Sequence, residues 1–308
     1  MAPAKTIWGG KWTEEKLDAF EKYVKAYLTI MNKNKGKWGW KTIYFDGFAG
    51  SGSRSSAEED QEFQSTASLF GEQDVTKDEL GVYRGAAERV VRLEEDGTPS
   101  FDMFCFVEKD DSSREALRAR LDNIPTAGSK KYFPGDANEV VCRFAGYLRE
   151  NSSRKALVFL DPFGMQIDWS TIQALSINGV DLWILIPTGV IINRLLEKRV
   201  NLDKGLIHSK KLSSFFGMPD DEIFNFFYET THTSTLFEED VTEVTKTTDS
   251  IKKIADLYVK KLQGCFKYVT ETPLVLYNNH NVPIFHLAFA SMNSTATKIA
   301  QQIINQKR

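Results

Sequence analysis

The chain has 308 residues, of which 42% are hydrophobic and 26% are charged, and these are ordinary values for a globular protein. This length allows one large α/β domain with insertions, or two small domains. The formal net charge of −3 excludes a general polyanion binder, so any contact with nucleic acid must come from a local basic patch.

The cysteines Cys105, Cys142 and Cys265 are widely separated, lie in apolar surroundings and lack the spacing of metal ligands. They indicate reduced core thiols in a cytoplasmic protein. No apolar run approaches the roughly 20 residues of a membrane span, and the first residues do not open a signal peptide. We therefore expect a cytoplasmic protein that does not contact a membrane.

Residues 13–33 are predicted to form an amphipathic helix. Thr13 can cap its amino end, and apolar residues that include Leu17 and Phe20 fall on one face.

The following stretch, residues 33–41, interleaves lysines with Trp38 and Trp40. A nucleic-acid strand could stack on the two indoles while the lysines meet its phosphates, which would steady the strand beside the active site. The alternative is a solvated connector whose tryptophans fold back on the core. We interpret residues 1–42 as an N-terminal helix with a basic and aromatic connector.

A short apolar strand then ends at Asp46 and breaks into a loop that contains Gly50 and Gly52. Glycine accepts a positive φ and lets a ligand lie against the backbone. Because open α/β sheets place their sites at the carboxyl ends of strands, Asp46 is a candidate site residue. The alternative is an ordinary strand and turn.

Residues 53–80 are polar and acidic and lose apolar periodicity. They are predicted to form a mobile insertion, either a lid over the site or a plain solvated loop.

Apolar strands and helical patterns then alternate with short connections. The predicted strands are residues 101–107, 131–133, 156–160 and 182–186. This alternation predicts a parallel, doubly wound α/β sheet. The first three of these strands are followed by acids, namely Glu108, Asp136 and Asp161.

The rest of the chain is expected to interrupt and then complete this sheet. Residues 189–269 are predicted to be a helical insertion. Residues 274–277 and 284–290 flank a turn-forming cluster and predict an antiparallel hairpin. The core is therefore expected at residues 43–188 and 270–308, with a closing helix.

The ordered strand ends and the terminal hairpin resemble class I S-adenosylmethionine-dependent methyltransferases. The resemblance implies a Rossmann-like fold in which the first loop, with Asp46, Gly50 and Gly52, holds the methionine part of the cofactor. It implies that Glu108 binds the ribose hydroxyls, that Asp136 faces adenine, and that the loop after the fourth strand faces the substrate. A carboxylate can accept two hydroxyls at once, which suits Glu108.

Nicotinamide binding would require a third glycine where this chain has Ser55, so a dinucleotide fits less well. The sequence Asp161-Pro162-Phe163-Gly164 resembles the Asp-Pro-Pro-aromatic motif of amino-methylating DNA and RNA enzymes. Here Phe163 replaces the second proline, and Gly164 stands where the aromatic residue should be. The alternative is that Pro162 and Phe163 only shape the turn.

A wider set of segments is similar to the three-Cys-motif partner (TcmP) family. These segments are residues 12–17, 44–52, 106–108, 159–164 and 289–299. The similarity implies a bacterial or phage protein that acts with a separate iron–sulfur, radical-type protein carrying the three-cysteine motif.

The leading hypothesis is a methyltransferase that acts on a nucleic acid or nucleotide. Asp161 would orient the acceptor by hydrogen bonding and Phe163 would hold it by stacking, with Pro162, Trp38 and Trp40 on the substrate side. The alternative is a catalytically silent module that positions substrate or cofactor for its partner. The histidines show no triad or metal spacing and receive no chemical role.

Overall fold

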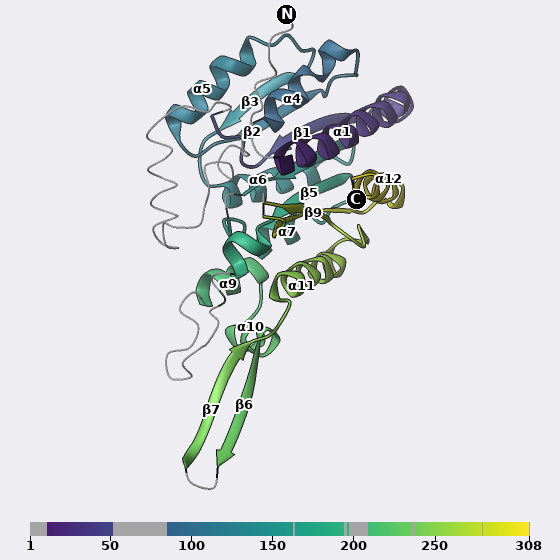
Figure 1. Cartoon of the computed structure of the whole chain (residues 1–308). Helices are drawn as coiled ribbons and strands as arrows, with labels where there is room; N and C mark the ends of the chain where they lie inside the picture. The colour runs from purple at the N-terminus through teal and green to yellow at the C-terminus, as the bar shows by residue number, and fades with distance from the viewer. Residues whose placement is uncertain are drawn as a thin grey trace, which may run out of the picture.

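Parallel strands form the centre of the fold (Figure 1). They are β1 (Lys41–Asp46), β2 (Met103–Val107), β3 (Ser129–Phe133), β4 (Arg154–Leu160) and β5 (Val180–Ile186). They lie in the order β3-β2-β1-β4-β5, and each neighbouring pair is parallel. This confirms the predicted doubly wound, Rossmann-like sheet. The strand order reverses between β1 and β4, which makes their carboxyl ends the topological switch point.

An antiparallel part extends the sheet beyond β5. Strand β10 (Pro283–Ser291) pairs with β5, and both β8 (Tyr268–Val269) and β9 (Leu274–Tyr277) pair with β10 in the antiparallel sense. The hairpin predicted near the carboxyl end is thereby confirmed. A sheet built only from dinucleotide-binding halves would continue with a parallel strand at this position.

The structure is a computed structural model. It describes residues 11–51, 85–162, 164–193, 196, 209–235, 238–278 and 280–307. The predicted insertion at 53–80, together with Gly52 and Phe163, lies outside these residues. Within the described part of the chain, no helix has the length and apolar character needed to cross a membrane.

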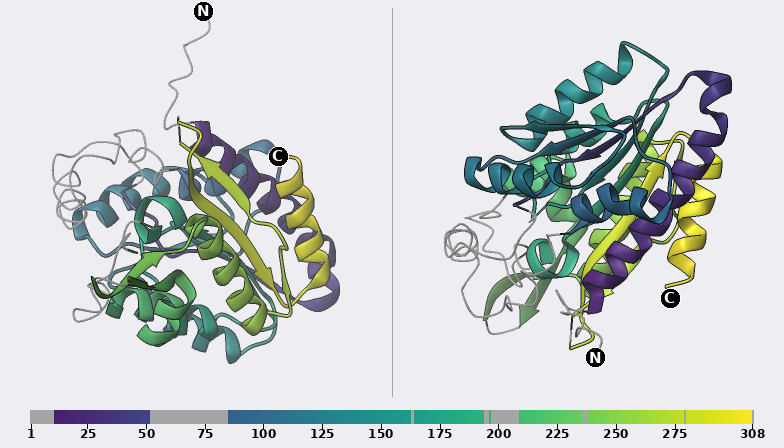
Figure 2. Two further views of the ribbon diagram at one scale, coloured as in Figure 1. Left: turned by 60° about the horizontal axis from the view of Figure 1, so that its bottom comes forward. Right: turned by 90° about the horizontal axis from the view of Figure 1, so that it is seen from above.

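Helices cover both faces of the sheet. One face carries α1 (Lys11–Trp38), α4 (Ala86–Arg92) with the 3₁₀ turn Leu93–Asp96, α5 (Asp111–Asp122) and α12 (Ser294–Asn305). The other carries α6 (Ala137–Arg149), α7 (Trp169–Ala174) and α11 (Ser250–Cys265). Figure 2 shows α1 beside α12. Side chains alternate along each strand, so Ile43 and Phe45 join the α6 side while Tyr44 joins the α1 side.

Helix α1 is longer than predicted. It continues through Trp38, so most of the expected connector is helical. The glycine inside it, Gly36, has open space around it and costs only about 1 kcal/mol relative to alanine. The helix ends where Gly39 takes a left-handed φ of 62° and its N–H donates to the Lys35 carbonyl at 2.8 Å.

The insertion is only partly helical, which corrects the prediction for residues 189–269. It begins with one π-helical turn (Thr188–Ile192) and contains α9 (Ser209–Phe216), α10 (Asp220–Phe227) and, near its end, α11. Between α10 and α11 lies an antiparallel hairpin of β6 (Tyr228–Thr235) and β7 (Glu238–Lys246), which projects from the body (Figure 1). Both strands are rich in threonine, and β-branched residues favour strands over helices.

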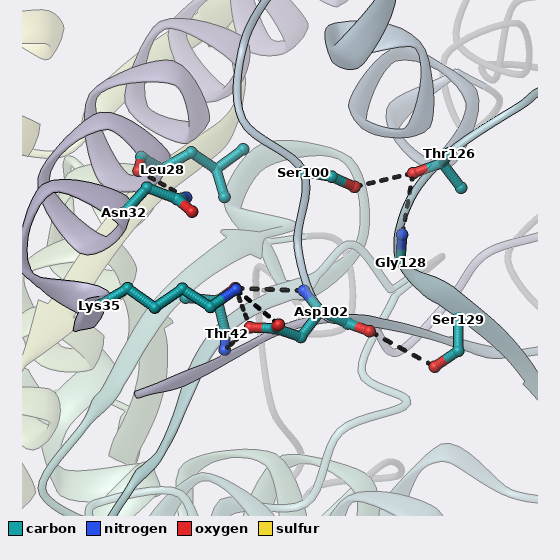
Figure 3. Close-up of polar contacts among 9 residues, drawn as sticks. All are labelled: Leu28, Asn32, Lys35, Thr42, Ser100, Asp102, Thr126, Gly128 and Ser129. Atoms are coloured by element: carbon teal, nitrogen blue, oxygen red, sulfur yellow. Dashed lines mark hydrogen bonds and ion pairs between the residues drawn. The ribbon is translucent and has the colours of Figure 1, made fainter. Parts of the chain in front are cut away.

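A polar cluster fastens the end of α1 to the amino edge of the sheet (Figure 3). Lys35 Nζ lies 2.6 Å from Asp102 Oδ1, and the backbone N–H of Thr42 donates to Asp102 Oδ2 at 2.8 Å. The Thr42 hydroxyl donates to the same oxygen at 3.0 Å. Asp102 therefore joins α1, β1 and the entry to β2.

We expect Asp102→Ala to lower the free energy of unfolding by about 1–3 kcal/mol, because the N–H of buried Thr42 loses its side-chain acceptor. The measurement is urea denaturation at neutral pH. Asp96→Ala is the matched control, since Asp96 forms only an exposed ion pair with Lys25 at 3.6 Å and such pairs contribute little. Equal stability of the two variants would contradict this account of the amino edge.

Candidate active site

Two buried aspartates mark the carboxyl edge of the sheet at the switch point. Asp46 is the last residue of β1, and Asp161 directly follows β4. They are 2% and 4% exposed. Asp46 lies opposite Phe159 in the parallel register. Because side chains alternate, Asp46 and Asp161 both lie on the face of the sheet that α1 covers.

A lysine from α1 meets one of these aspartates. Lys16 is fully buried, and its Nζ lies 2.5 Å from Asp161 Oδ2. One turn further along α1, the Phe20 ring stacks on Phe159 with centroids 4.2 Å apart. In the first turn, Trp12 stacks on Phe285 of β10 at 5.1 Å. The amino end of α1 is thus fastened over the carboxyl edge.

Lys16 was missed in the sequence, although a signal for it was present. It lies at i+3 from Thr13 and at i−4 from Phe20, so it occupies the apolar face of the helix. A lysine on the buried stripe of an amphipathic helix needs a charged partner. The acids at the strand ends were the candidate partners for Lys16, and the structure pairs it with Asp161.

Asp161 retains an unused acceptor. Its Oδ1 is buried and has no hydrogen-bond partner within the described part of the chain, and the same holds for the Thr13 hydroxyl. A buried acceptor without a donor costs about 1–3 kcal/mol. Burial raises the pKa of Asp161, while Lys16 acts to lower it. The arrangement therefore leaves a desolvated carboxyl oxygen that could accept a hydrogen bond from a ligand.

Asp46 organises the loop that follows β1. Its Oδ1 accepts from the Phe48 N–H at 3.1 Å, and its Oδ2 accepts from the Tyr44 hydroxyl at 3.0 Å. Burial raises the pKa of Asp46 to about 7, against the lowering effect of these hydrogen bonds. Both carboxylate oxygens thus have partners inside the protein, so Asp46 shapes the loop that follows β1.

Glycines allow this loop to pass close to its neighbours. A Cβ on Gly47 would lie 2.5 Å from Leu160 Cδ2, and Gly50 has a φ of 61°. The Ala49 N–H donates to the Val107 carbonyl at 3.0 Å, which ties the loop to the end of β2. Gly50 therefore lies where the sequence placed it, with the left-handed backbone expected of a ligand-binding loop.

The remaining cofactor-side acids lie along the same edge. Glu108 follows β2 and is half-buried, and its Oε1 accepts from the Asp110 N–H at 2.9 Å. Asp136 is exposed and caps α6 by accepting from the Asn138 N–H at 2.8 Å. Each has a local structural role in addition to the binding role that the sequence suggested.

Asn138 supports the loop that carries Asp161. Its side-chain nitrogen donates to the Gln166 carbonyl at 2.8 Å. Its Oδ1 accepts from the Asp168 N–H at 2.9 Å and from the Thr171 hydroxyl at 2.8 Å. These bonds join the start of α6 to the segment between β4 and α7. In the sequence, only the position of Asn138 near the end of a predicted strand points to this role.

The structure separates the two halves of the predicted substrate site. Pro162 is buried next to Asp161, and Phe163 lies outside the described residues. Trp38 and Trp40 precede β1 and therefore lie at the amino edge of the sheet. At about 3.3 Å per residue, β1 alone separates them from Asp46 by roughly 17 Å. They do not lie beside the active site, because residues before a strand cannot reach its carboxyl end.

Two other polar features do not belong to this site. His286 of β10 is buried, its Nδ1 lies 2.8 Å from the Thr188 hydroxyl, and burial lowers its pKa to about 4. A shallow hollow of about 390 Å³ is lined by α7, α9 and α11. It opens to solvent on the side of the sheet opposite α1, so we do not connect it with Asp161.

Neither protein-family models nor curated proteins give a match to this chain. All three cysteines are free; Cys105 is buried and Cys265 half-buried, but Cys142 is exposed, which corrects its prediction as a core thiol. Among the described residues, no three His, Cys, Asp or Glu side chains are grouped to hold a metal ion.

We expect the wild type to lose stability relative to the Asp46→Asn variant as the pH rises, because only the wild type has a buried carboxyl that ionises. The folded pKa of about 7 exceeds the ordinary aspartate value of 3.8, so the folded state binds more protons than the unfolded state between these pH values. The contribution of Asp46 to the free energy of unfolding of the wild type is therefore fully present below about pH 4. It is lost progressively as the pH rises to about 7. The loss amounts to at most about 4 kcal/mol.

The measurement is urea denaturation of both proteins at pH 5 and pH 8. The variant keeps an oxygen for Phe48, so the pH dependence of the difference reports ionisation of Asp46. A stability difference that is the same at both pH values would show that Asp46 does not titrate in this range.

Proposed function

We propose that the protein is an S-adenosylmethionine-dependent methyltransferase that modifies a nucleic acid or nucleotide in the cytoplasm. We further propose that it acts with a separate three-Cys-motif, radical-type iron–sulfur protein. The observation that carries the enzymatic proposal is the buried pair of Asp46 and Asp161 at the switch point, with one Asp161 oxygen left for a ligand. The partner proposal rests on the sequence resemblance.

The residues along the carboxyl edge fit the cofactor. The left-handed backbone at Gly50 permits close approach of a compact ligand, and the loop is tied to the end of β2, where Glu108 begins the next connection. Glu108 would accept the ribose hydroxyls, and Asp136 would lie toward the adenine. When bound, the sulfonium of the cofactor supplies an electrophilic methyl group.

The substrate side depends on Asp161. Its Oδ1 would accept a hydrogen bond from an exocyclic amino group and so align the acceptor nitrogen. Lys16 holds the other oxygen and favours the ionised form of Asp161 despite burial. Methyl transfer from a sulfonium depends mainly on positioning, which a dry and rigid site can provide.

One observation favours the alternative, a silent module that positions substrate or cofactor for its partner. The first turns of α1 cover the carboxyl edge, and Lys16 already occupies one side of Asp161. A module of this kind needs the residues proposed to bind the cofactor, but it does not need space beside Asp161 for a methyl-accepting substrate. The two functions therefore differ in whether the wild-type chain itself transfers a methyl group.

We expect the protein to bind S-adenosylmethionine or its demethylated product with micromolar affinity. Gly50→Val should abolish binding, because a β-branched residue disfavours positive φ. Glu108→Gln should weaken binding by about 1.5–3 kcal/mol, since charged hydrogen bonds are lost. The measurement is titration calorimetry on folded protein. Gly97→Val is the matched control, because Gly97 also has positive φ but lies after α4. Absence of heat with both cofactor forms would contradict cofactor binding.

We expect Asp161→Ala to remove methyl transfer and to change cofactor affinity by only a few-fold, because the change deletes the oxygen that accepts a hydrogen bond from the acceptor. Lys16→Met should shift the pH profile of transfer to higher pH, since buried Asp161 then holds its proton more tightly. The assay measures labelled methyl transfer to DNA and RNA oligonucleotides with the partner present.

Removal of one partner of a buried ion pair can destabilise a protein by about 3–5 kcal/mol. The double variant Lys16→Met with Asp161→Leu removes both charges and should remain folded, yet it should transfer no methyl group. Full turnover by this double variant, or by Asp161→Ala, would show that the acceptor binds elsewhere. Absence of transfer by the wild-type protein with the partner present would leave the silent module as the better account.

A further inference from the structure

The two tryptophans at the amino edge of the sheet form a stack in which Trp38 is exposed and Trp40 is half-buried. The rings of Trp38 and Trp40 are 6.1 Å apart at their centroids and are inclined by only 12°. Trp38 is 56% exposed, whereas Trp12, Trp169 and Trp183 are buried. Gly39 in the left-handed conformation turns the chain between the two rings. The stack is therefore built by the end of α1 and is not part of the core.

Cations surround this stack. Lys37 Nζ lies 4.9 Å from the Trp38 ring centroid, and Lys155 Nζ of β4 lies 5.8 Å from that of Trp40. Lys33 and Lys41 are exposed nearby in sequence. Within the described part of the chain, the neighbouring acid Asp102 is paired with Lys35, and no ion pair joins a carboxylate to Lys33, Lys37, Lys41 or Lys155.

We propose that this surface, formed by Trp38, Trp40, Lys37 and Lys155 and called here the amino-edge platform, binds single-stranded nucleic acid. The exposed Trp38 ring offers an aromatic face on which an unpaired base can stack, and the lysines offer positive charge to the phosphates. Bases in a duplex are already stacked on each other and cannot use such a face. The positive platform contrasts with the net charge of −3 of the whole chain.

The platform is separate from the candidate active site. At about 1.5 Å per residue, α1 places Trp38 roughly 33 Å along its axis from Lys16, which contacts Asp161. Binding at the platform does not require methyl transfer, so it stands or fails independently of the proposed function. If both proposals hold, the platform anchors a strand whose target base is treated at the opposite edge.

The test uses a fluorescein-labelled oligothymidylate of about 12 nucleotides, with affinity measured by anisotropy on the full chain. Trp38→Ala should weaken binding at least about fivefold, because one stacked base is lost. Lys37→Gln should weaken it less and should reduce the slope of log affinity against log salt by about 0.7. Both side chains are exposed, so we expect unchanged thermal unfolding.

Matched controls distinguish a local site from general effects. Tyr277→Ala removes another exposed aromatic residue, and Lys252→Gln removes another exposed lysine; neither should change the affinity by more than about twofold. Asp161→Asn should also retain oligonucleotide binding, whatever it does to turnover.

Three results would overturn the proposal. The first is unchanged affinity in Trp38→Ala. The second is binding of the duplex of the same sequence as tightly as the single strand. The third is a Trp38→Ala variant that changes the sedimentation of the protein but not its affinity for the oligonucleotide, which would make the stack a protein interface.

Discussion

The ion pair between Lys16 and Asp161 is the contact on which the arrangement of the carboxyl edge depends. Both groups are removed from water, and neither could remain charged there alone. The pair fixes the amino end of α1 over β4, while Phe20 and Trp12 add ring contacts on either side. Near the other end of α1, Lys35 forms an ion pair with Asp102 at the amino edge, so one helix connects both edges of the sheet.

This ion pair is weak evidence for stability. Replacing a buried pair by packed apolar side chains is often neutral or stabilising, because desolvation offsets the attraction. A second carboxyl, Asp46, lies on the same side of the sheet. Burial raises the pKa of Asp46 to about 7, and the charge of Asp161 adds to this rise. The proposed acceptor site therefore rests on Asp161 Oδ1, a buried acceptor without a hydrogen-bond partner in the described part of the chain, and not on the ion pair.

The core was predictable because its signals are local. Apolar runs located the parallel strands, and their acidic ends located Asp46, Glu108 and Asp161. What could not be predicted depends on contacts between distant segments. The pairing of Lys16 with Asp161 and the bonds from Asn138 to the loop after β4 need the tertiary fold.

Two errors had signals in the sequence. The threonine-rich segment of β6 and β7 is β-branched and was nevertheless assigned to a helical insertion. Trp38 and Trp40 stand before β1, so they had to lie at its amino end. The edge of the sheet at which a residue lies depends on whether it precedes or follows a parallel strand, and the composition of a segment does not show this.

The two edges of the sheet have different properties, and the difference follows from topology. Carboxyl ends of parallel strands meet at one edge, where loops can gather acids and glycines around a small ligand. The amino edge receives the ends of the helices, and here α1 delivers lysines and an indole stack to it. The length of α1 separates the indole stack from Lys16 and Asp161 by roughly 33 Å within a single element.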